Sequence, residues 1–558
     1  MTNKKIAQQF SLLSKLMDIH GENSFSAKNY SIAAYRIEKL PMDLNNLDTK
    51  EIFSLPSIGE STGKKILEII AGGELPALRK IIDNTPEGIL EMMKIKGIGP
   101  KKIHLIWKKM GIENIGELLY ACNENRLSNF KGFGKKTQDN VIESIGFYLS
   151  QQGNYLFAQV EQLSIDLLKQ FQQLFGKNNI QLTGEIRRHS ETINILEYLI
   201  PVDLTEISKT LQSHSEFEYI EQSTDFIVYQ YNNGIKLKLY ACPDNKLIEL
   251  LFITTGSDQF IDAFKQSFPA INYWSLKDEQ DIFKEANIQY IPPFLREDAA
   301  IISITKNNKI PQLIQPIDIK AIIHCHSNWS DGTNTLEQLA EACIKSGKEY
   351  LVISDHSKAA DYAQGLSEER ITAQHKLVDE LNEKLKPFKI FKSIESDILN
   401  DGNLDYSNSI LSTFDLVIAS VHSNLKMNEE KAMMRVLKAI ENPYTTILGH
   451  MTGRLLLSRP GYPLDHKKII DACASNNVVI EINANPHRLD MRWQWIEYAK
   501  SKNILFSIDP DSHSIPEFEN TRYGVLIAQK GMVTAKENLS SFSLAEFENF
   551  LKSRNKAI

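Results

Sequence analysis

Cysteine is scarce in this sequence, and no two cysteines have the spacing of a metal-binding or redox pair. The 558 residues contain five cysteines and no CxxC pair. They are Cys122, Cys242, Cys325, Cys343 and Cys473. This usage argues against a disulfide framework and against a thiolate zinc site. We expect five reduced thiols, mostly in hydrophobic cores.

Long apolar runs are absent as well. No stretch approaches the roughly 18 apolar residues of a membrane span, and the start of the chain is too polar for a secretory signal. We therefore expect a cytoplasmic protein with no membrane partner. No low-complexity tract interrupts the chain, and its length exceeds what one hydrophobic core organises, so we expect about three or four folded domains.

An overall positive charge is also missing, because the formal net charge is −7. The charge is nevertheless uneven along the chain. Residues 1–150 contain 21 Lys and Arg against 17 Asp and Glu, which leaves this part near +4 and the remainder near −11. Residues 94–136 contain 10 basic and 3 acidic residues. This basic region predicts contact with a polyanion such as DNA.

The basic region overlaps a threefold internal repeat. The segments Leu55–Gly59, Ile95–Gly99 and Phe130–Gly134 share an apolar-x-[Gly/Ser]-apolar-Gly pattern, and an amphipathic helix pattern follows each. They resemble helix-hairpin-helix motifs, in which glycines permit a tight turn and leave backbone N–H groups for a phosphate. Lysines after each turn would neutralise DNA charge without reading its sequence; the alternative is that each turn only joins two helices. The predicted DNA contacts are Gly59, Gly97, Gly99, Lys101, Lys102, Gly132, Gly134, Lys135 and Lys136.

The surroundings of the first hairpin, Ser24–Arg36 and Gly72–Leu75, are similar to the amino-terminal domain of family-X DNA polymerases. In that family a lysine after the first hairpin can serve as a Schiff-base nucleophile in lyase chemistry. The resemblance assigns this position to Lys65. A phosphate contact is the alternative role of Lys65, because an amine nucleophile needs a depressed pKa and nothing in the sequence indicates one.

The segment 183–198 (TGEIRRHSETINILEY) resembles the palm motif of the same family, whose aspartates hold two magnesium ions for nucleotidyl transfer. The match places Ile195 at the first aspartate, Glu197 at the second and Lys238 at the third. Glu185 replaces the phosphate-binding serine, and Asp258 stands where the family commonly has lysine. We therefore expect a palm that folds but has lost Mg²⁺ binding and polymerisation.

The thumb-like segment Tyr290–Glu297 matches the family closely and supports this alignment. A palm without its carboxylates has two possible uses. It is either a structural spacer, or its basic residues, Arg187 and Arg188 among them, help to position a DNA end.

Beyond residue 318, short apolar strands alternate with helical segments. Strands are expected at 321–323, 350–354, 416–420, 446–449, 478–483 and 504–509. This alternation indicates a parallel sheet closed into a barrel, where functional groups lie at the carboxyl ends of the strands. Polar residues follow the strands at those ends. The predicted metal ligands are His324, His326, Asp331, His356, Glu395, His422, His450, Asp511 and His513.

The spacing of these residues suits a metal centre. Alternation along a strand places His324 and His326 on one side, about 7 Å apart, and does the same for Asp511 and His513. One histidine at a strand end is usually an ordinary hydrogen-bonded residue, but nine ligand-type residues at successive strand ends indicate metal binding. Nitrogen and oxygen ligands suit Zn²⁺, Mn²⁺ or Fe²⁺ alike.

This constellation resembles the PHP (polymerase and histidinol phosphatase) superfamily, in the order found at the carboxyl end of bacterial family-X polymerases. The resemblance implies a distorted (β/α)7 barrel with two or three divalent ions. The implied ligand sets are His324, His326, Glu395 and Asp511; then Asp331, His356 and His513; then His422, His450 and a bridging Glu395. Arg454, Arg488 and Asp355 lie beside these motifs and either support catalysis, by holding phosphate or orienting an imidazole, or are structural.

The predicted fold class is multidomain, α+β and α/β. We expect a lyase-like hairpin domain at 1–82, a fingers-like hairpin domain at 83–150, a degenerate nucleotidyltransferase palm and thumb at 151–312, and a PHP domain at 318–558. The predicted function is DNA-repair hydrolysis of phosphodiesters as a 3′-5′ exonuclease, with abasic-site cleavage and 3′ phosphate removal as further uses of the same cluster.

The expected partner is gapped or 3′-ended DNA, bound by a monomer that associates with the nucleoid. Three alternatives remain open at this point. The chain could be an active family-X polymerase, a small-molecule phosphatase of the histidinol phosphate kind, or a DNA-binding scaffold.

Overall fold

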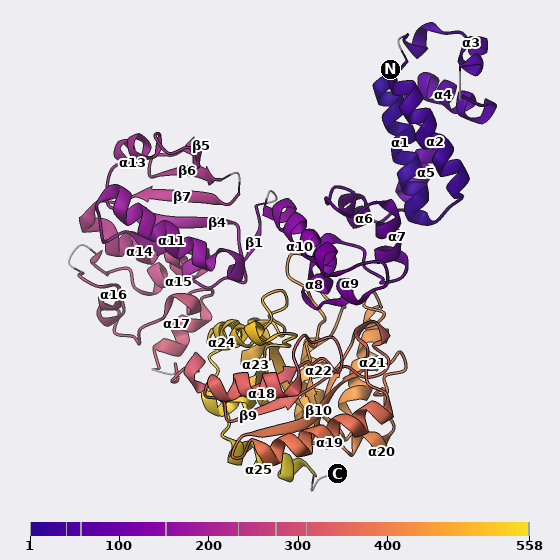
Figure 1. Cartoon of the computed structure of the whole chain (residues 1–558). Coiled ribbons are helices and arrows are strands. Elements are labelled where there is room, and N and C mark those ends of the chain that lie inside the picture. Colours follow the sequence, from indigo (N-terminus) through magenta and orange to yellow (C-terminus); the bar gives the residue numbers. More distant parts are fainter. Residues whose placement is uncertain are drawn as a thin grey trace. The chain divides into compact units, whose positions relative to one another are not determined.

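The computed structural model describes residues 2–40, 42–55, 58–150, 153–232, 234–273, 276–307 and 310–555. These residues form two compact units (Figure 1). The first consists of the chain up to Asn123 together with Lys131–Gly146, and the second of Glu124–Phe130 and the chain from Phe147. The four predicted domain ranges are finer than this division and stay predictions. No helix within the described ranges is both long enough and apolar enough to cross a membrane.

The first unit is entirely helical in its described part. Its first two helices, α1 and α2, pack together through apolar residues spaced three or four apart, such as Ile6, Phe10, Leu13 and Met17 of α1. Its helices are α1 (Asn3–His20), α2 (Ser24–Glu38), α3 (Thr49–Ser54), α4 (Glu60–Gly72), α5 (Pro76–Asp83), α6 (Glu87–Met92), α7 (Pro100–Lys108), α8 (Ile115–Asn123) and α10 (Lys135–Ser150).

The second unit begins with a mixed five-stranded sheet, the palm, whose strand order is β2-β4-β7-β6-β5. The strands are β2 (Gln181–Thr183), β4 (Ile195–Ile200), β5 (Phe217–Gln222), β6 (Phe226–Tyr231) and β7 (Lys236–Ala241). The accompanying helices are α11 (Phe157–Phe175), α12 (Gly184–Arg187), α13 (Leu204–Leu211), α14 (Leu247–Thr255), α15 (Asp258–Ser267), α16 (Glu279–Glu285) and α17 (Ala300–Thr305). A two-stranded sheet, β1 (Tyr155–Leu156) with β3 (Thr192–Ile193), lies beside the palm motif.

The rest of the second unit is a sheet of seven parallel strands, in the order β14-β13-β12-β11-β10-β9-β8. The strands are β8 (Ala321–Cys325), β9 (Tyr350–Ile353), β10 (Lys389–Asp397), β11 (Leu416–Ser420), β12 (Thr445–Leu448), β13 (Val479–Asn483) and β14 (Phe506–Asp509). The helices between and after them include α18 (Leu336–Lys345), α19 (Glu368–Lys384), α21 (Glu429–Ile440), α22 (His466–Ser475), α23 (Ile496–Ser501), α24 (Thr521–Lys530) and α25 (Leu544–Asn555).

The two end strands meet, so the sheet is a nearly closed barrel. The His326 backbone N–H donates to the Ser512 carbonyl across 2.8 Å, just beyond β8 and β14. Strand residues alternate between two cores, as the strand period of two requires. Tyr350 and Val352 of β9 pack with Phe547 of α25, whereas Leu351 and Ile353 pack with residues of α18 and α19. The distorted (β/α)7 barrel and the mixed helix and sheet content are confirmed.

The five cysteines are free and buried, as expected.

Candidate metal centre and nucleic-acid interface

The nine predicted ligands lie at one end of the barrel, after the carboxyl ends or in the last residues of the strands. The structure buries eight of them completely or nearly so, and leaves 9% of the His422 side chain exposed. Parallel strands end at the same edge of a barrel, which is why residues almost 200 positions apart, such as His324 and His513, come together here.

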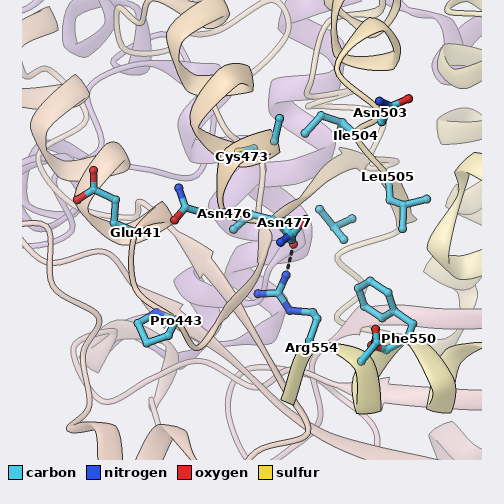
Figure 2. Close-up of a pocket in the computed structure, with 14 residues that line it drawn as sticks. Glu441, Pro443, Cys473, Asn476, Asn477, Asn503, Ile504, Leu505, Phe550 and Arg554 are labelled. Carbon is cyan, nitrogen blue, oxygen red and sulfur yellow. Dashed lines mark hydrogen bonds between the residues drawn. The ribbon is translucent and has the colours of Figure 1, made fainter. Parts of the chain in front are cut away.

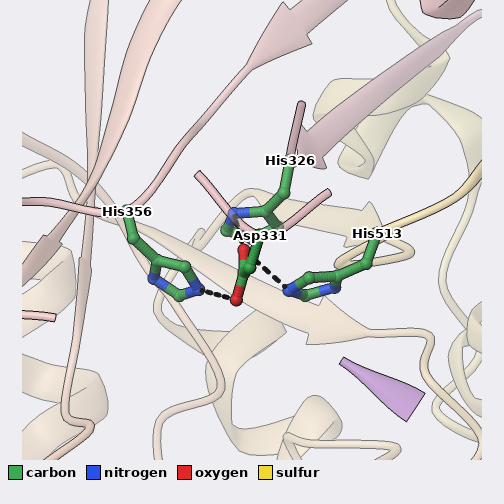
Figure 3. A group of neighbouring side chains, drawn as sticks. All are labelled: His326, Asp331, His356 and His513. Atoms are coloured by element: carbon green, nitrogen blue, oxygen red, sulfur yellow. Dashed lines mark ion pairs between the residues drawn. The ribbon is translucent and has the colours of Figure 1, made fainter. Parts of the chain in front are cut away.

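One group of ligand-type residues forms around Asp331 (Figure 3). The Asp331 carboxylate lies between two imidazoles, 3.5 Å from His356 Nε2 and 3.4 Å from His513 Nε2. The His326 ring stacks on the His513 ring, with centroids 4.3 Å apart. This group contains the whole predicted set of Asp331, His356 and His513, and adds His326 to it.

A second group consists of His324, His326 and Asp511. Asp511 Oδ1 lies 3.4 Å from His324 Nε2 and 3.2 Å from His326 Nε2. The backbone at His324 (φ +58°) and Asp511 (φ +50°) is left-handed, a conformation that costs a residue with a side chain and is often found at functional sites. At His324 this conformation interrupts the register between β8 and β9, so a bulge, not simple alternation, brings the two imidazoles together.

The third group consists of His356, Glu395 and His422. His450 lies beside it, as the implied set has it: His450 Nε2 is 3.0 Å from Glu395 Oε1, and His422 Nε2 is 3.1 Å from the same oxygen. Glu395 Oε1 is also 3.2 Å from His324 Nε2. Glu395 therefore lies where it can bridge the groups.

The donor atoms fit divalent metal ions. Many of them are buried without a well-oriented hydrogen bond, although several lie at ion-pair distance. These atoms are His324 Nε2, His326 Nδ1, Asp331 Oδ2, His356 Nδ1, Glu395 Oε2, His422 Nδ1, His450 Nδ1 and His513 Nε2. Buried polar atoms are rarely left unsatisfied in folded proteins, and the concentration of such atoms at one place suits a site completed by cations.

The carboxylates and imidazoles of these groups stabilise each other's charged forms. Burial by itself would raise the pKa of Glu395, but His422 and His324 outweigh it and hold that pKa well below its ordinary value. In the same way, burial would lower the pKa of His513, yet Asp331 raises it to about 10. Glu395 and Asp397 overcome burial at His422 and raise its pKa to about 9. Without metal, the cluster is held together by carboxylates and protonated imidazoles.

His326 is the exception. Burial, together with the nearby His513 and His356, lowers the pKa of His326 to about 3. Its imidazole is therefore neutral at physiological pH, the form in which histidine binds metals. Because His326 belongs to both the Asp331 group and the Asp511 group, it is the ligand that connects them.

Two carboxylates that sequence reasoning missed hold the imidazoles in place. Glu481 Oε1 lies 2.5 Å from His324 Nδ1, and its other oxygen accepts from the His450 backbone N–H across 2.5 Å. Asp397 Oδ1 lies 3.3 Å from His422 Nδ1. The available signal was position: Asp397 follows Glu395 by two residues, so both side chains point to the same side of β10, and Glu481 lies on the strand after His450.

The three predicted support residues have different surroundings. Asp355 accepts hydrogen bonds from the Ser327 backbone and hydroxyl and from Ser330 and Gln374, and so it organises the loop after β8. Arg488 Nε lies 3.7 Å from Asp511 Oδ2, beside the metal groups. The third, Arg454, forms a bidentate pair with Glu191 of the palm, and this contact makes a phosphate-holding role for it hard to support.

In the palm, the three positions of the polymerase carboxylates lie side by side. Glu197 of β4 pairs in register with Lys238 of β7, and Ile195 lies two residues before it. Lys238 Nζ is 4.0 Å from Glu197 Oε1, which also accepts a hydrogen bond from the Tyr240 hydroxyl across 2.9 Å. Burial, only partly offset by Tyr240 and Lys238, raises the pKa of Glu197. A lysine thus occupies the neighbourhood in which the family holds a cation.

The two arginines of the palm motif have partners within the palm and thumb. Arg187 forms an ion pair with Glu279 of α16 at 2.7 Å. Arg188 lies 3.3 Å from Glu297 and donates to the Thr255 carbonyl. These contacts give both guanidinium groups a structural role, and a role in positioning a DNA end stays a prediction.

The hairpin turns have the backbone that the repeat predicted. Gly97 (φ +97°) and Gly132 (φ +102°) are left-handed, which strongly favours glycine. Gly99 precedes α7 without a side-chain cap. Apart from the adjoining residues of the chain, no described residue has an atom within 4 Å of the position that a Cβ at Gly97, Gly99 or Gly134 would take. The turns thus leave open space at helix N-termini, as phosphate binding requires.

The lysines beside these turns differ in exposure. Lys101, Lys135 and Lys136 are exposed, and Lys102 is half-buried, with its Nζ 5.7 Å from the centroid of the Phe133 ring. In the first hairpin, residues 56 and 57 lie outside the described part of the chain, and Gly59 precedes α4. DNA contact by these residues stays a prediction.

Lys65, the candidate lyase nucleophile, lies on α4. Its Nζ is 3.5 Å from the Ser61 hydroxyl and 5.7 Å from the centroid of the Tyr30 ring. Neither contact distinguishes a nucleophile from a phosphate contact, so both roles stay predictions.

A cavity of about 520 Å³ lies away from the metal groups (Figure 2). It is lined by residues that precede or begin the strands β12, β13 and β14, such as Pro443, Val478 and Ile504, and by Arg554 of α25. Arg554 donates to the backbone carbonyls of Asn477 and Thr445. The cavity is therefore at the amino ends of these strands, opposite the end that carries the ligands.

Comparison with known families finds three matching segments. Residues 1–75 match the helix-hairpin-helix domain, residues 89–146 match the SAM-like helix-hairpin-helix tandem, and residues 323–485 match the PHP domain. The chain is also 30% identical to "DNA polymerase/3′-5′ exonuclease PolX" of Bacillus subtilis (strain 168), over 99% of this chain and 100% of that protein.

Shorter matches are to proteins named as probable phosphatases. One from Thermoanaerobacter sp. (strain X514) is 32% identical over 27% of this chain and 58% of its own length. Another, from Vibrio parahaemolyticus serotype O3:K6, is 25% identical over 43% of this chain and 96% of its own length.

Proposed function

Because the chain belongs to the PolX family of DNA polymerase/3′-5′ exonucleases, we propose that it is a metal-dependent nuclease whose barrel hydrolyses DNA phosphodiesters from the 3′ end. The observation that carries the proposal is the convergence of nine buried or nearly buried ligand-type residues at one end of the barrel. Abasic-site cleavage and 3′ phosphate removal would use the same groups.

Two or three divalent ions, Zn²⁺, Mn²⁺ or Fe²⁺, would be held by the three groups of residues around Asp331, Asp511 and Glu395. When bound, such ions supply Lewis acidity that polarises a phosphoester and activates water at neutral pH. The chain itself would contribute the neutral His326, the carboxylates that fix the imidazoles, and a phosphate contact from Arg488, whose guanidinium lies beside Asp511.

DNA is the partner, bound through the hairpins of the first unit without regard to sequence. The open backbone at Gly97, Gly99 and Gly134 and the lysines that follow support phosphate contacts. Gapped or 3′-ended DNA is the substrate that a hairpin domain and an end-directed nuclease would share. We propose that the chain acts as a monomer.

Polymerisation is lost in this proposal. Two-metal nucleotidyl transfer needs clustered carboxylates, and here Ile195 and Lys238 occupy two of the three positions. The remaining Glu197 is bonded to Tyr240 and lies at ion-pair distance from Lys238. Mg²⁺ would have to displace a lysine from beside the only carboxylate of the three.

A second candidate is a small-molecule phosphatase, because several relatives over the shorter matches are named probable phosphatases. The two candidates differ in their need for the first unit. A nuclease binds DNA with a steep salt dependence, whereas a small-molecule phosphatase does not need to bind DNA at all.

The test is digestion of end-labelled, gapped and 3′-ended DNA by the full chain with Mn²⁺, together with metal analysis of the purified protein. We expect stepwise release of nucleotides from the 3′ end, abolished by His326→Ala. His375→Gln, a change of a barrel histidine on α19 away from the cluster, is the matched control and should keep the activity. Digestion that is undiminished in the His326 variant would refute the proposal.

A further inference from the structure

Glu191 of the palm contacts the barrel at a buried arginine. Both carboxylate oxygens accept from the Arg454 guanidinium, at 2.7 Å to Nη2 and 3.2 Å to Nη1. The side chain of Arg454 is 3% exposed and that of Glu191 is 20% exposed. Bidentate pairs of this kind fix geometry as well as charge.

The same guanidinium joins two loops of the barrel. Arg454 Nε donates to the Arg488 carbonyl across 2.9 Å, and Nη2 also donates to the Leu489 carbonyl. Arg454 itself belongs to the loop after β12, while Arg488 and Leu489 belong to the loop after β13. Glu191, through Arg454, therefore holds these two loops against each other.

Both loops carry groups of the candidate metal centre. The loop after β12 contains His450, whose carbonyl accepts from the Gly453 N–H across 2.8 Å and whose Nε2 lies 3.0 Å from Glu395. The loop after β13 carries the Arg488 guanidinium, 3.7 Å from Asp511. Arg454 is thus connected to Glu395 through the 450–453 turn and His450, and to Asp511 through Arg488.

The neighbouring residues of the palm motif contact the thumb-like part, which reaches the barrel through Glu297. Arg188 and Lys530 of α24 both pair with Glu297, at 3.3 Å and 2.5 Å, and Lys530 is a barrel residue that is nearly completely buried. His189 stacks on Phe294, with ring centroids 5.7 Å apart. Glu297 therefore provides a second ion-pair connection between the palm motif and the barrel.

Removal of the carboxylate would leave a buried charge. Without Glu191, the Arg454 guanidinium has no carboxylate partner among the described residues, and an unpaired buried charge is strongly unfavourable. The guanidinium would be expected to move toward solvent and release the two loop carbonyls. Loops that hold metal ligands would then lose order while the strands of the barrel stay in place.

We propose that Glu191 is a positioning residue for the nuclease, so that the degenerate palm completes the metal centre of the barrel by holding Arg454 across the loops of His450 and Arg488. This inference rests on the proposed metal-dependent activity. It gives the palm a function that needs neither magnesium nor a nucleotide.

The test compares Glu191→Ala with Glu161→Ala in the full chain. Glu161 is the matched control because it also connects palm and barrel, through an ion pair to Arg522 on α24 at 2.7 Å, but Arg522 is on no ligand-bearing loop. For Glu191→Ala we expect Mn²⁺ affinity about tenfold or more weaker, in the range found for residues that support metal ligands. Glu161→Ala should bind Mn²⁺ like the wild type.

Two further readouts separate positioning from general destabilisation. Hydrogen exchange of the metal-free protein should become faster in segments 449–456 and 485–490 of Glu191→Ala, with the barrel strands unchanged. On DNA, kcat should fall, because the palm contact holds the loop of the metal ligand His450. Glu191→Asp, which keeps the charge, should recover part of the Mn²⁺ affinity.

The outcomes distinguish the inference from the proposed function. If the wild type digests no DNA, the nuclease proposal fails, but Mn²⁺ titration and hydrogen exchange still report on Glu191. If Glu191→Ala matches the wild type in Mn²⁺ affinity and in exchange of both loops, the inference is overturned. Equal losses in the Glu191 and Glu161 variants would also overturn it, because they would mean that any weakening of the palm contact has the same effect.

Discussion

At the scale of single residues, the imidazoles of the metal centre depend on carboxylates that are not themselves in the predicted ligand set. Glu481 contacts the imidazole of His324 and the backbone of His450 at once. A metal-binding histidine normally has its second ring nitrogen fixed by such a partner, which sets its tautomer and its orientation. One carboxylate therefore supports ligands from two different strands.

We predict that Glu481→Gln weakens divalent-metal binding by about 10- to 100-fold, because the amide cannot hold His324 with a negative charge. The measurement is titration of the metal-free protein with Mn²⁺ or Zn²⁺. Glu497→Gln, a change of an exposed glutamate on α23, is the control and should leave the affinity as it is. An unchanged affinity in the Glu481 variant would mean that the surrounding packing alone orients His324.

A pH dependence follows from the protonated histidines. In the metal-free protein Asp331 raises the pKa of His513 to about 10 against the effect of burial, and Glu395 raises that of His422 to about 9. Both imidazoles must release a proton before they bind a cation, so metal affinity should increase as the pH rises from 6 toward 9.

Calorimetric titration at pH 7 in two buffers of different ionisation enthalpy measures this proton release. We expect at least one proton to be released as the metal binds. A metal affinity that does not vary between pH 6 and 9 would contradict the prediction and would mean that these histidines are already neutral.

At the scale of elements, the palm and thumb are joined by a buried charge cluster. Glu279 of α16 pairs with Arg296 at 2.6 Å and with Arg187 at 2.7 Å, and the Arg296 side chain is completely buried. Burial alone would raise the pKa of Glu279, but hydrogen bonds from Arg187 and the charge of Arg296 lower it to about 2. Removing the acid would leave two guanidinium groups without compensation.

We predict that Glu279→Gln lowers the free energy of unfolding of the palm and thumb by about 3 to 5 kcal/mol. The wild-type contribution of Glu279 is present above the ordinary pKa near 4.5 and is lost as the pH falls toward 2, since a depressed pKa favours the folded state only while the acid is ionised. The free energies of unfolding of the wild type and of Glu279→Gln should therefore differ less at pH 3 than at pH 7. Urea denaturation across this pH range measures both.

Glu383→Gln is the control for this change. It removes an ion pair with Lys386 in which both side chains are about two thirds exposed or more, so we expect a loss below about 1 kcal/mol. A Glu279 variant no less stable than the Glu383 variant at pH 7 would count against a structural role of the buried cluster.

The third hairpin carries a prediction about DNA. Lys135 and Lys136 are exposed at the start of α10, directly after the Gly132–Gly134 turn. If both lysines neutralise phosphates, the variant with Lys135→Gln and Lys136→Gln should bind DNA more weakly. The slope of log K against log salt concentration should become less steep by about 2. Fluorescence anisotropy across a salt series measures both quantities.

An equal change of charge elsewhere is the control. Lys467→Gln with Lys468→Gln alters two exposed, adjacent lysines on α22 of the barrel. We expect no change of slope there, and a slope that falls equally in both variants would mean that net charge, not the hairpin, determines binding.

At the scale of the whole molecule, one chain combines a palm with Ile195 and Lys238 at two of the three expected carboxylate positions and a barrel that brings nine ligand-type residues to one end. We predict that gapped DNA with nucleoside triphosphates and Mg²⁺ gives no primer extension, under conditions in which the same preparation digests DNA with Mn²⁺. Gel analysis of labelled primers measures both reactions. Primer extension that disappears on Glu197→Ala would contradict the prediction and show that this carboxylate still works.

Local patterns were enough to locate most of the site. Six histidines with three carboxylates after successive apolar strands predicted a metal centre, and the structure brings all nine to one end of the barrel. The pattern could not predict the distances within the centre. Glu395 lies 2.9 Å from His356 Nδ1 and 3.0 Å from His450 Nε2. The path of each loop sets such distances, and strand ends alone do not determine them.

The roles of Arg187, Arg188 and Arg454 were also beyond the sequence. The residue type alone does not tell whether an arginine binds phosphate or forms an ion pair within the fold. Only the group that it contacts in the structure distinguishes the two roles. The ion-pair partner of each arginine is far away along the chain. Glu279 is 92 positions from Arg187, Glu297 is 109 positions from Arg188, and Glu191 is 263 positions from Arg454. No local pattern connects residues so far apart.

Short-range patterns predicted the hairpin repeat, the alternation of strands and helices, and the ligand-type residues at the strand ends, because glycine turns, strand periods and side-chain types are local properties. The carboxylate that contacts each imidazole, and the contact of Glu191 with Arg454, became visible only in the folded chain. Those contacts depend on how distant loops pack, and packing is a property of the folded chain as a whole.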